Sequence, residues 1–315
     1  MIRRKIAIIG ASTGGPRSLR SLCSNLHRMV TCVVIIQHMP SHFNGAFVEM
    51  LKDVTPMQVK LAEDGDVLVD DQILVVPSGV HLELVNNRRV VFTYGERVNN
   101  VRPSIDVAMK SVRQANNMDI MGVLLTGMGC DGVEGIEHIK SIGGTTIVQN
   151  KETSAVHNMP ASAIDTGAVD FFLSPEEIAD RLDELRVLVH QQEDVIEARY
   201  VGKRIAGDLG FRSVQQTQIA TAISELVRNA IVHAGNGIMV LKPFREGSLD
   251  RVGLEITIKD EGPGINDIQL AMEDGFSNNG DGLGKGLSGT KRIMDEFDIK
   301  SEVGVGTEVC VKKLV

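Results

Sequence analysis

The sequence lacks the features that mark secreted, membrane-spanning and zinc-binding proteins. Its four cysteines are scattered, with no C-x-x-C spacing, which argues against a disulfide framework and a zinc site. No apolar run approaches the length of a membrane span, and the run behind the basic N-terminus MIRRK is only as long as a strand. The net charge of −8 lacks the basic excess that broad nucleic-acid binding needs. We therefore expect a soluble, cytoplasmic protein.

The chain is long enough for two domains, and its first part alternates between strand and helix patterns. It has 315 residues, of which 43% are hydrophobic and 23% charged, as in globular proteins. The runs KIAIIG, TCVVIIQ, DQILVVP and MGVLLTG are continuously apolar, which is typical of parallel strands buried on both faces. Helical patterns, among them SIDVAMKSVRQA, lie between them. Residues 1–182 are therefore predicted to form a doubly wound α/β domain with a mostly parallel sheet, with a β-hairpin around Asn86 and Asn87.

The pattern changes after residue 182. A short strand in LDELRVLVH is followed by two helical stretches, EDVIEARYVGKRIAGDLG and QTQIATAISELVRNAIVHAG. Then come the strands NGIMVLKP and GLEITIKD, a glycine-rich segment, the helix GLSGTKRIMDEF and a last strand TEVCVKKL. Helices followed by antiparallel strands indicate an α+β sandwich over residues 183–315.

Three polar residues of types used in nucleophilic catalysis follow buried strands of the first domain. Ser12 follows IAIIGA, His38 follows VVIIQ, and Asp131 follows VLLTGMGC. The carboxyl ends of parallel strands meet at one edge of a sheet, where ligands bind. His38 could take a proton from Ser12, and Asp131 could orient the imidazole. Backbone N–H groups at the start of the helix after Ser12 could hold an oxyanion.

A glycine-rich turn between a strand and a helix is more often a phosphate-binding loop, and that interpretation is the main rival here. Against it, the loop has no Walker lysine, and no acidic residue ends the second strand to bind a ribose. Asp106 is a weaker catalytic candidate, because Ser104 would cap a helix and place Asp106 in its first turn. His42 and His157 are expected at the surface or in the wall of the site.

Six motifs follow one another in order over residues 1–182: GASTGG, QHMP, LAEDGDVLVDDQILVVPSGVHLEL, VRPSIDVAMKSV, GVLLTGMGCDGVEGI and SAVHNMPASAIDTGAVDFFL. This part of the chain resembles the catalytic domain of CheB, the chemotaxis methylesterase family. The resemblance implies that Ser12, His38 and Asp131 are a catalytic triad that hydrolyses glutamate γ-methyl esters on chemoreceptors, with glutamine deamidation as a related activity. It also implies that Met128 lies near the site. The receiver domain usual in that family is not expected here.

A second set of chemistry-bearing residues lies in the last third of the chain. Glu225, Asn229 and His233 are spaced by four and so share one face of a helix. By itself, such a polar face is more often exposed to solvent than part of a binding site. Downstream, DEGPGI follows the apolar strand LEITIK, and GDGLGKGLSG precedes a helix. A carboxylate at a strand end can accept from an exocyclic amine, glycines let a base approach, and a glycine cluster at a helix N-terminus suits phosphates. The amide oxygen of Asn229 is a suitable Mg²⁺ ligand beside phosphates.

Residues 183–315 resemble the GHKL (Bergerat) ATPase fold, and within it the RsbT-like serine/threonine switch kinases. The resemblance rests on the segments EDVIEARYVGKRIAGDLGF, ATAISELVRNAI, DEGPGINDIQLAMEDGFS, GLGKGLSGTKRIMDEFDI and GTEV. The resemblance implies ATP and Mg²⁺ as cofactors, with Asp260 reading adenine, Asn229 holding the metal and Glu225 acting as general base. The implied nucleotide-binding residues are Asn229, Asp260, Gly262, Gly264, Gly282, Gly284, Gly286 and Thr307.

The sequence is thus interpreted as a bifunctional signalling protein. The expected partners are a methylated chemoreceptor-like protein and an antagonist protein with a phosphorylatable Ser or Thr, and the interpretation allows a homo-oligomer. Two alternatives stay open. In one, the methylesterase half is a non-catalytic sensor or scaffold and only the kinase is active. In the other, the kinase half is a nucleotide-gated binding module.

Overall fold

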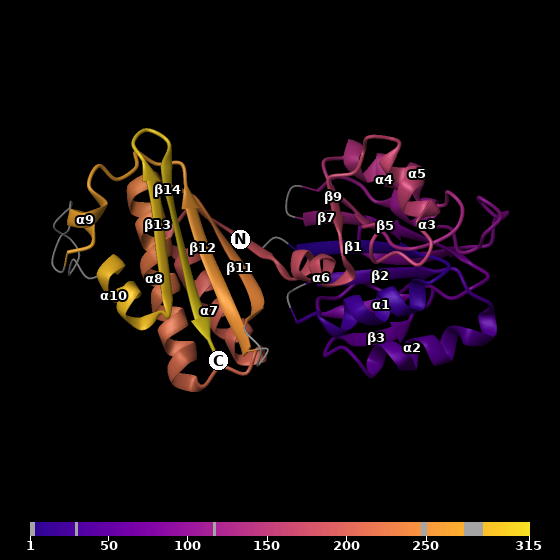
Figure 1. Cartoon of the computed structure of the whole chain (residues 1–315), viewed down its shortest axis with the longest axis horizontal. Helices are drawn as coiled ribbons and strands as arrows, with labels where there is room; N and C mark the ends of the chain where they lie inside the picture. The colour runs from indigo at the N-terminus through magenta and orange to yellow at the C-terminus, as the bar shows by residue number, and fades with distance from the viewer. Residues whose placement is uncertain (1–3, 29–30, 116–117, 247–250, 274–285) are drawn as a thin grey trace. The chain divides into compact units, whose positions relative to one another are not determined.

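The computed structural model describes residues 4–28, 31–115, 118–246, 251–273 and 286–315. They form two compact units, Arg4–Asp183 and Glu184–Val315, each with its own sheet (Figure 1). Within the described ranges, no helix combines the length and the apolar character that a membrane span requires.

The described part of the first unit contains a seven-stranded parallel sheet. Its order is β3 (Gln58–Leu61), β4 (Gln72–Val75), β2 (Thr31–Gln37), β1 (Arg4–Ala11), β7 (Met118–Leu124), β8 (Thr145–Gln149) and β9 (Phe171–Leu173). The strand order reverses at β1, so the loops after β1 and β7 leave the sheet side by side. This reversal is where ligands bind in open α/β sheets. The predicted doubly wound fold is confirmed.

Helices cover both faces of this sheet (Figure 1). One face carries α1 (Gly15–Ser24), α2 (Asn44–Lys52) and α6 (Pro175–Asp183); the other carries α3 (Ile105–Ser111), α4 (Val133–Ser141) and α5 (Asn158–Ile164). Along β1, Ile6 and Ile8 enter one hydrophobic core while Ala7 and Ile9 enter the other. Burial on both faces explains why the strand reads as a continuous apolar run.

The predicted hairpin is confirmed, whereas one predicted helix is too long. Strands β5 (His81–Val85) and β6 (Arg89–Thr93) pair antiparallel, and Asn86 and Asn87 turn between them with φ near 54° and 53°. The helix pattern SIDVAMKSVRQA ends at Ser111. Val112 is extended and fully buried, and its carbonyl accepts a 2.9 Å hydrogen bond from His138 Nε2. Packing at Val112 therefore overrides helix propensity there.

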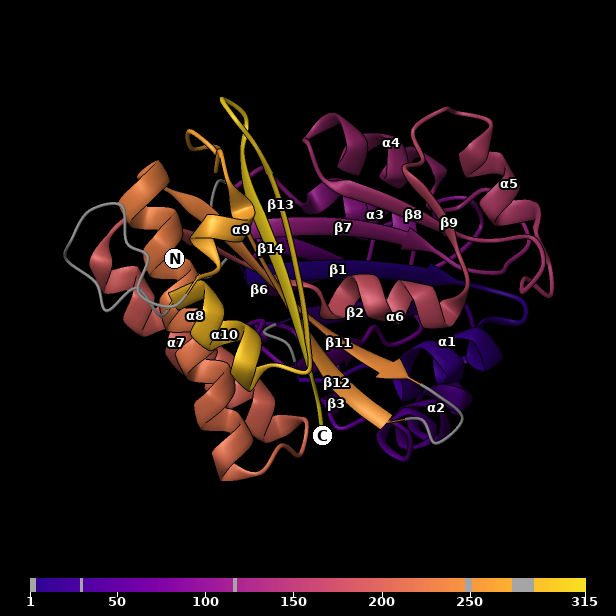
Figure 2. The same cartoon turned by 60° about the vertical axis from the view of Figure 1, so that its left-hand side comes forward.

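The second unit has a five-stranded sheet in its described residues, all pairs antiparallel. Its order is β10 (Leu185–Val189), β11 (Gly237–Glu246), β12 (Arg251–Asp260), β14 (Gly306–Leu314) and β13 (Glu296–Glu302). Helices α7 (Gln192–Asp208), α8 (Ser213–Ala234) and α10 (Gly286–Ile293) lie on one face (Figures 1 and 2), and α9 spans Ile268–Ala271. The core-facing positions predicted for α8, Ile219, Ile223, Leu226 and Ala230, are all buried. The α+β sandwich is confirmed.

The sequence analysis missed strand β13 by extending the preceding helix to Phe297. The helix ends at Ile293, and the Asp295 N–H already donates to Lys312 O on β14. The Asp295 carboxylate then accepts from Lys313 Nζ and from the Leu314 N–H, both at 2.8 Å. These ladder and side-chain bonds convert an apparently helical stretch into an edge strand.

Candidate active sites

Ser12 is the first residue after β1, and hydrogen bonds to two neighbouring strand ends fix its backbone. Its N–H donates to Thr126 O at 3.0 Å, in the loop after β7. Its carbonyl accepts from Gln37 Nε2 at 3.0 Å, at the end of β2, and from the Gly15 N–H at 2.9 Å. Gly14 caps α1 with φ of 82°, a conformation that glycine adopts at little cost. The tight turn thus presents the Ser12 side chain at the carboxyl edge of the sheet.

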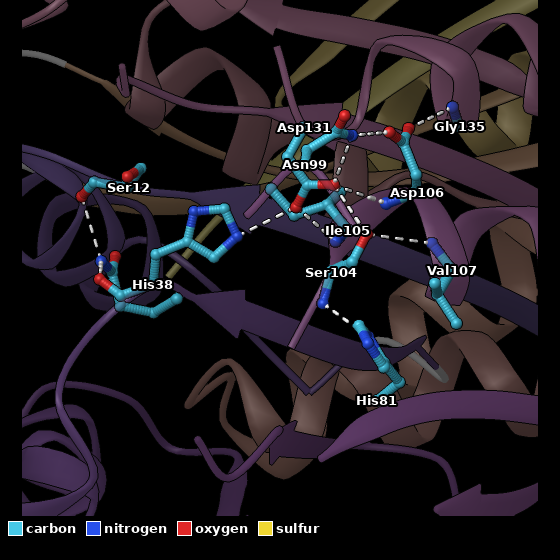
Figure 3. Close-up of polar contacts among 11 residues, drawn as sticks. Ser12, His38, His81, Asn99, Ser104, Ile105, Asp106, Val107, Asp131 and Gly135 are labelled. Atoms are coloured by element: carbon cyan, nitrogen blue, oxygen red, sulfur yellow. Dashed lines mark hydrogen bonds and ion pairs between the residues drawn. The ribbon is translucent and has the colours of Figure 1, made fainter. Parts of the chain in front are cut away.

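His38 follows β2 directly and lies between Ser12 and Asp131 (Figure 3). Its Nε2 is 3.0 Å from Asp131 Oδ2, and both side chains are largely buried. An ionised carboxylate only accepts, so Nε2 carries the proton and Nδ1 keeps its lone pair. In Figure 3 Nδ1 is on the side of the ring toward Ser12. No hydrogen bond between Ser12 Oγ and His38 is among the described contacts.

Asp131 lies in the loop after β7 and is only 3% exposed. Besides His38, its Oδ2 accepts from the Ile105 N–H at 2.7 Å, and its Oδ1 accepts from Ser104 Oγ at 2.7 Å. Asn99 Nδ2 is a weaker donor to Oδ1, at 3.3 Å. Burial by itself raises the pKa of the Asp131 carboxyl, but these hydrogen bonds outweigh burial and hold the pKa below its ordinary value. The Asp131 carboxylate is therefore ionised at neutral pH.

The donors around Asp131 were not predicted as site residues. Ser104 was expected only as a helix cap, and it is one: its Oγ also accepts from the Val107 N–H at the start of α3. Asp106 lies in the first turn of α3, as expected, and accepts from Asn99 Nδ2 and from the Gly135 N–H. The sequence signal that could have pointed to these donors is the predicted helix cap at Ser104, because the free N–H groups of a helix N-terminus attract a carboxylate.

Two N–H groups next to Ser12 are candidates for the expected oxyanion donors. The N–H groups of Ser12 and Gly15 are already engaged, whereas no described hydrogen bond uses those of Thr13 and Gly14. Met128 lies on the loop between β7 and Asp131 and is 72% exposed. His42 and His157 make no described contact with Ser12, His38 or Asp131. His42 is exposed, and the Nδ1 atom of His157 is 3.4 Å from Ser154 Oγ.

In the second unit, Asp260 ends β12 opposite Thr307 of β14. Asp260 Oδ1 accepts from the Gly262 N–H at 2.9 Å and from the Thr307 N–H at 3.2 Å. Thr307 Oγ1 is 2.8 Å from Ser301 Oγ, which also accepts from the Ile265 N–H. The other oxygen of Asp260, Oδ2, has no partner among the described contacts. Asp260 and Thr307 are thus brought together, and Ser301, which the sequence analysis did not single out, supports Thr307.

Gly262 and Gly264 have structural reasons to be glycine. A Cβ on Gly262 would lie 2.6 Å from Ala234 Cβ at the end of α8. Gly264 has φ of 72°, and a Cβ there would lie 2.3 Å from Glu302 O. A side chain at either position would therefore collide with the protein itself, which is a packing reason for glycine in addition to the predicted approach of a base.

The helix α8 brings Glu225 and Asn229 next to Gly286. A Cβ on Gly286 would lie 3.4 Å from Glu225 Oε2 and 3.5 Å from Asn229 Nδ2. Glu225 Oε1 forms a 2.7 Å ion pair with Arg228 Nη1. His233, the third member of the predicted stripe, is exposed. Gly282 and Gly284, which were predicted to bind phosphates, lie outside the described residues.

Comparison with known proteins assigns both units to families. Residues 7–182 match the family model of the CheB methylesterase, so the chain belongs to the CheB methylesterase family. Residues 214–314 match the family of histidine kinase-, DNA gyrase B- and HSP90-like ATPases. The second unit is thus a GHKL-type ATPase domain.

Individual relatives match a little more than half of the chain. The chain is 41% identical over 170 residues to a protein-glutamate methylesterase/protein-glutamine glutaminase of Sulfurimonas denitrificans, covering 53% of this chain and 48% of the relative. It is 37% identical over 185 residues to the protein of that name in Thermotoga maritima, covering 58% and 54%. The crystal structure of the Thermotoga maritima CheB methylesterase catalytic domain matches with a TM-score of 0.54 and 34% identity, over 57% of this chain and 97% of that one. The chain spans about half the length of the curated relatives it matches.

Proposed function

We propose that Ser12, His38 and Asp131 form a triad that hydrolyses glutamate γ-methyl esters of a protein. The observation that carries this proposal is the 3.0 Å bond between His38 Nε2 and a buried, ionised Asp131, with Ser12 on the opposite side of the ring. The names of the relatives, protein-glutamate methylesterase and protein-glutamine glutaminase, agree with it. Both names describe attack on the side-chain carbonyl of a glutamyl or glutaminyl residue. The proposed substrate is a methylated chemoreceptor-like protein.

The proposed reaction has two acyl-transfer steps. Ser12 Oγ attacks the ester carbonyl while His38 Nδ1 takes its proton, and Asp131 stabilises the imidazolium that results. The N–H groups of Thr13 and Gly14 stabilise the oxyanion. His38 then returns the proton to the departing methoxide, so methanol leaves and an acyl-serine remains. Water, deprotonated by His38, hydrolyses this ester and regenerates Ser12 with a free glutamate.

A substitution at Gly127 tests whether the position of Ser12 relative to His38 matters for hydrolysis. A Cβ on Gly127 would lie 2.8 Å from Ser12 Cβ and 2.9 Å from Met159 Cε. Gly127→Ala should push the serine out of line with His38 and lower kcat for methyl-ester hydrolysis by about tenfold or more. The matched control is Gly45→Ala, because a Cβ on Gly45 meets nothing within 4 Å. Equal rates for the two variants in a methanol-release assay would argue against this placement of Ser12.

We further propose that the ATPase domain phosphorylates a Ser or Thr of an antagonist-type partner protein. The residues fit an adenine nucleotide: Asp260 is held by two N–H groups at Oδ1 and has Oδ2 left to accept from an exocyclic amine. Gly286 opens a helix beside the Asn229 amide, which would hold Mg²⁺, and the ion would neutralise charge on the phosphates of the nucleotide. Glu225 would accept the proton of the partner's hydroxyl.

The metal role of Asn229 predicts a selective defect. Asn229→Ala should weaken ATP binding by about tenfold or more when Mg²⁺ is present, because the amide oxygen is lost as a ligand. Without Mg²⁺, the affinity for ATP should hardly change. Titration calorimetry under both conditions gives the answer, with Asn236→Ala, an exposed asparagine just past α8, as the control. An unchanged affinity with Mg²⁺ would refute the assignment.

A specific contact favours a second candidate for this domain. The ion pair with Arg228 engages Oε1 of Glu225, the proposed base. A nucleotide-gated module that binds its partner without phosphorylating it would need no free base. The ³²P content of an antagonist protein after incubation with γ-³²P-labelled ATP distinguishes the two, because only the kinase labels it.

A further inference from the structure

A buried histidine outside the triad is connected to Asp131 through one intermediate residue. His81 begins β5 and is only 2% exposed. Its Nε2 lies 2.9 Å from Glu96 O. A carbonyl oxygen only accepts, so Nε2 carries the proton. Nδ1 then holds a lone pair and accepts from the Ser104 N–H at 3.1 Å. His81 is thus neutral, in a single tautomer, with both ring nitrogens engaged.

Ser104 connects His81 to the proposed triad through hydrogen bonds to Asp131. Its Oγ donates to Asp131 Oδ1 at 2.7 Å, and the next N–H, of Ile105, donates to Asp131 Oδ2 at 2.7 Å (Figure 3). One short segment therefore contacts both carboxylate oxygens, including the one that faces His38. The Ser104 N–H is buried, so without Nδ1 it would lose its partner. An unsatisfied buried N–H is costly, and the segment would shift to avoid it.

We propose that His81 is a positioning residue: it fixes Ser104, and through Ser104 it sets the orientation of the Asp131 carboxylate toward His38. The inference rests on the proposed esterase function. The competing explanation is purely structural, in which His81 only anchors the loop that contains Glu96. The two explanations use different ring nitrogens, Nδ1 for positioning and Nε2 for anchoring.

Substitution of His81 by asparagine or by glutamine separates the roles of the two ring nitrogens. The Oδ1 atom of asparagine can take the place of Nδ1 as an acceptor, whereas the Nε2 atom of glutamine can take the place of Nε2 as a donor. His81→Asn should therefore keep kcat for methyl-ester hydrolysis within about threefold of wild type, while His81→Gln should lower it about tenfold or more with KM nearly unchanged. The control is His138→Gln, which replaces a histidine of α4 whose Nε2 is hydrogen-bonded to Val112 O.

A second measurement is independent of turnover: ¹⁵N NMR of the imidazoles reports the tautomer of His38. Wild type and His81→Asn should show His38 protonated at Nε2, and His81→Gln should show a mixture. A glutamine variant with wild-type kcat and tautomer, or an asparagine variant as impaired as the glutamine one, would overturn the inference. If the wild-type protein releases no methanol, the proposed esterase function fails, and the His38 tautomers still decide whether His81 acts on Asp131.

Discussion

Ser12→Ala is expected to abolish methyl-ester hydrolysis while leaving ATP affinity unchanged. Without Oγ there is no nucleophile, and loss of a triad serine lowers kcat by about 10⁴-fold or more in hydrolases of this type. The backbone bonds of Ser12 to Thr126 and Gln37 do not involve the side chain, so the turn should keep its shape. The proposed nucleotide-binding residues lie in the other unit, and calorimetry should find the ATP affinity of the variant equal to that of wild type.

Ser24→Ala is the matched control for this experiment. Ser24 is exposed, and its Oγ donates to the Ser21 carbonyl of its own helix and accepts weakly from Asn25 Nδ2. Methanol release from a methylated receptor fragment should be the same for Ser24→Ala as for wild type. Release near the wild-type rate by Ser12→Ala would remove the serine from the mechanism and return its loop to the rival interpretation, a phosphate-binding turn.

The second large effect is expected at Asp260. Asp260→Asn keeps the shape of the side chain but removes the charge that accepts from the Gly262 and Thr307 N–H groups and, in the proposal, from adenine. Hydrogen bonds to charged groups contribute roughly 1.5–3 kcal/mol, so ATP should bind about 10- to 100-fold more weakly. Methyl-ester hydrolysis should be unaffected, since Asp260 is not part of the first unit.

Asp298→Asn provides the comparison for Asp260. Asp298 is an exposed carboxylate on β13 of the same domain, 3.7 Å from Lys300 Nζ, and exposed pairs of this kind contribute little to stability. The ATP affinity of the Asp298→Asn variant should equal that of the wild-type protein. If Asp260→Asn also binds ATP like wild type, adenine is recognised elsewhere and the assignment of this end of β12 is wrong.

The sequence predicted the fold of the first unit well because its parallel strands are buried on both faces. Such strands appear as uninterrupted apolar runs, and the residues after them, Ser12 and His38, are then at one edge of the sheet by topology alone. Asp131 is further from its strand, since β7 ends at Leu124. The strand-end argument nevertheless included Asp131, because its loop follows the apolar run VLLTG, and the resemblance implied the same residue.

The partners of Asp131 could not be predicted from local pattern. Asn99 and Ser104 reach it from a loop 27 to 32 residues away in sequence, and His81 acts from a separate hairpin. Edge strand β13 was missed for a related reason. Its sequence EFDIKSE places charged residues outward, and its pairing with β14 is a non-local contact.

The most direct test of the bifunctional account is a single reaction with two readouts. The purified protein is incubated with Mg²⁺, γ-³²P-labelled ATP, an antagonist protein and a methylated receptor fragment, and released methanol and protein-bound phosphate are measured together. The account predicts both products, with methanol lost in Ser12→Ala and phosphate labelling lowered in Asp260→Asn at limiting ATP. Phosphate without methanol from the wild-type protein would contradict it and leave the first unit as a sensor or scaffold.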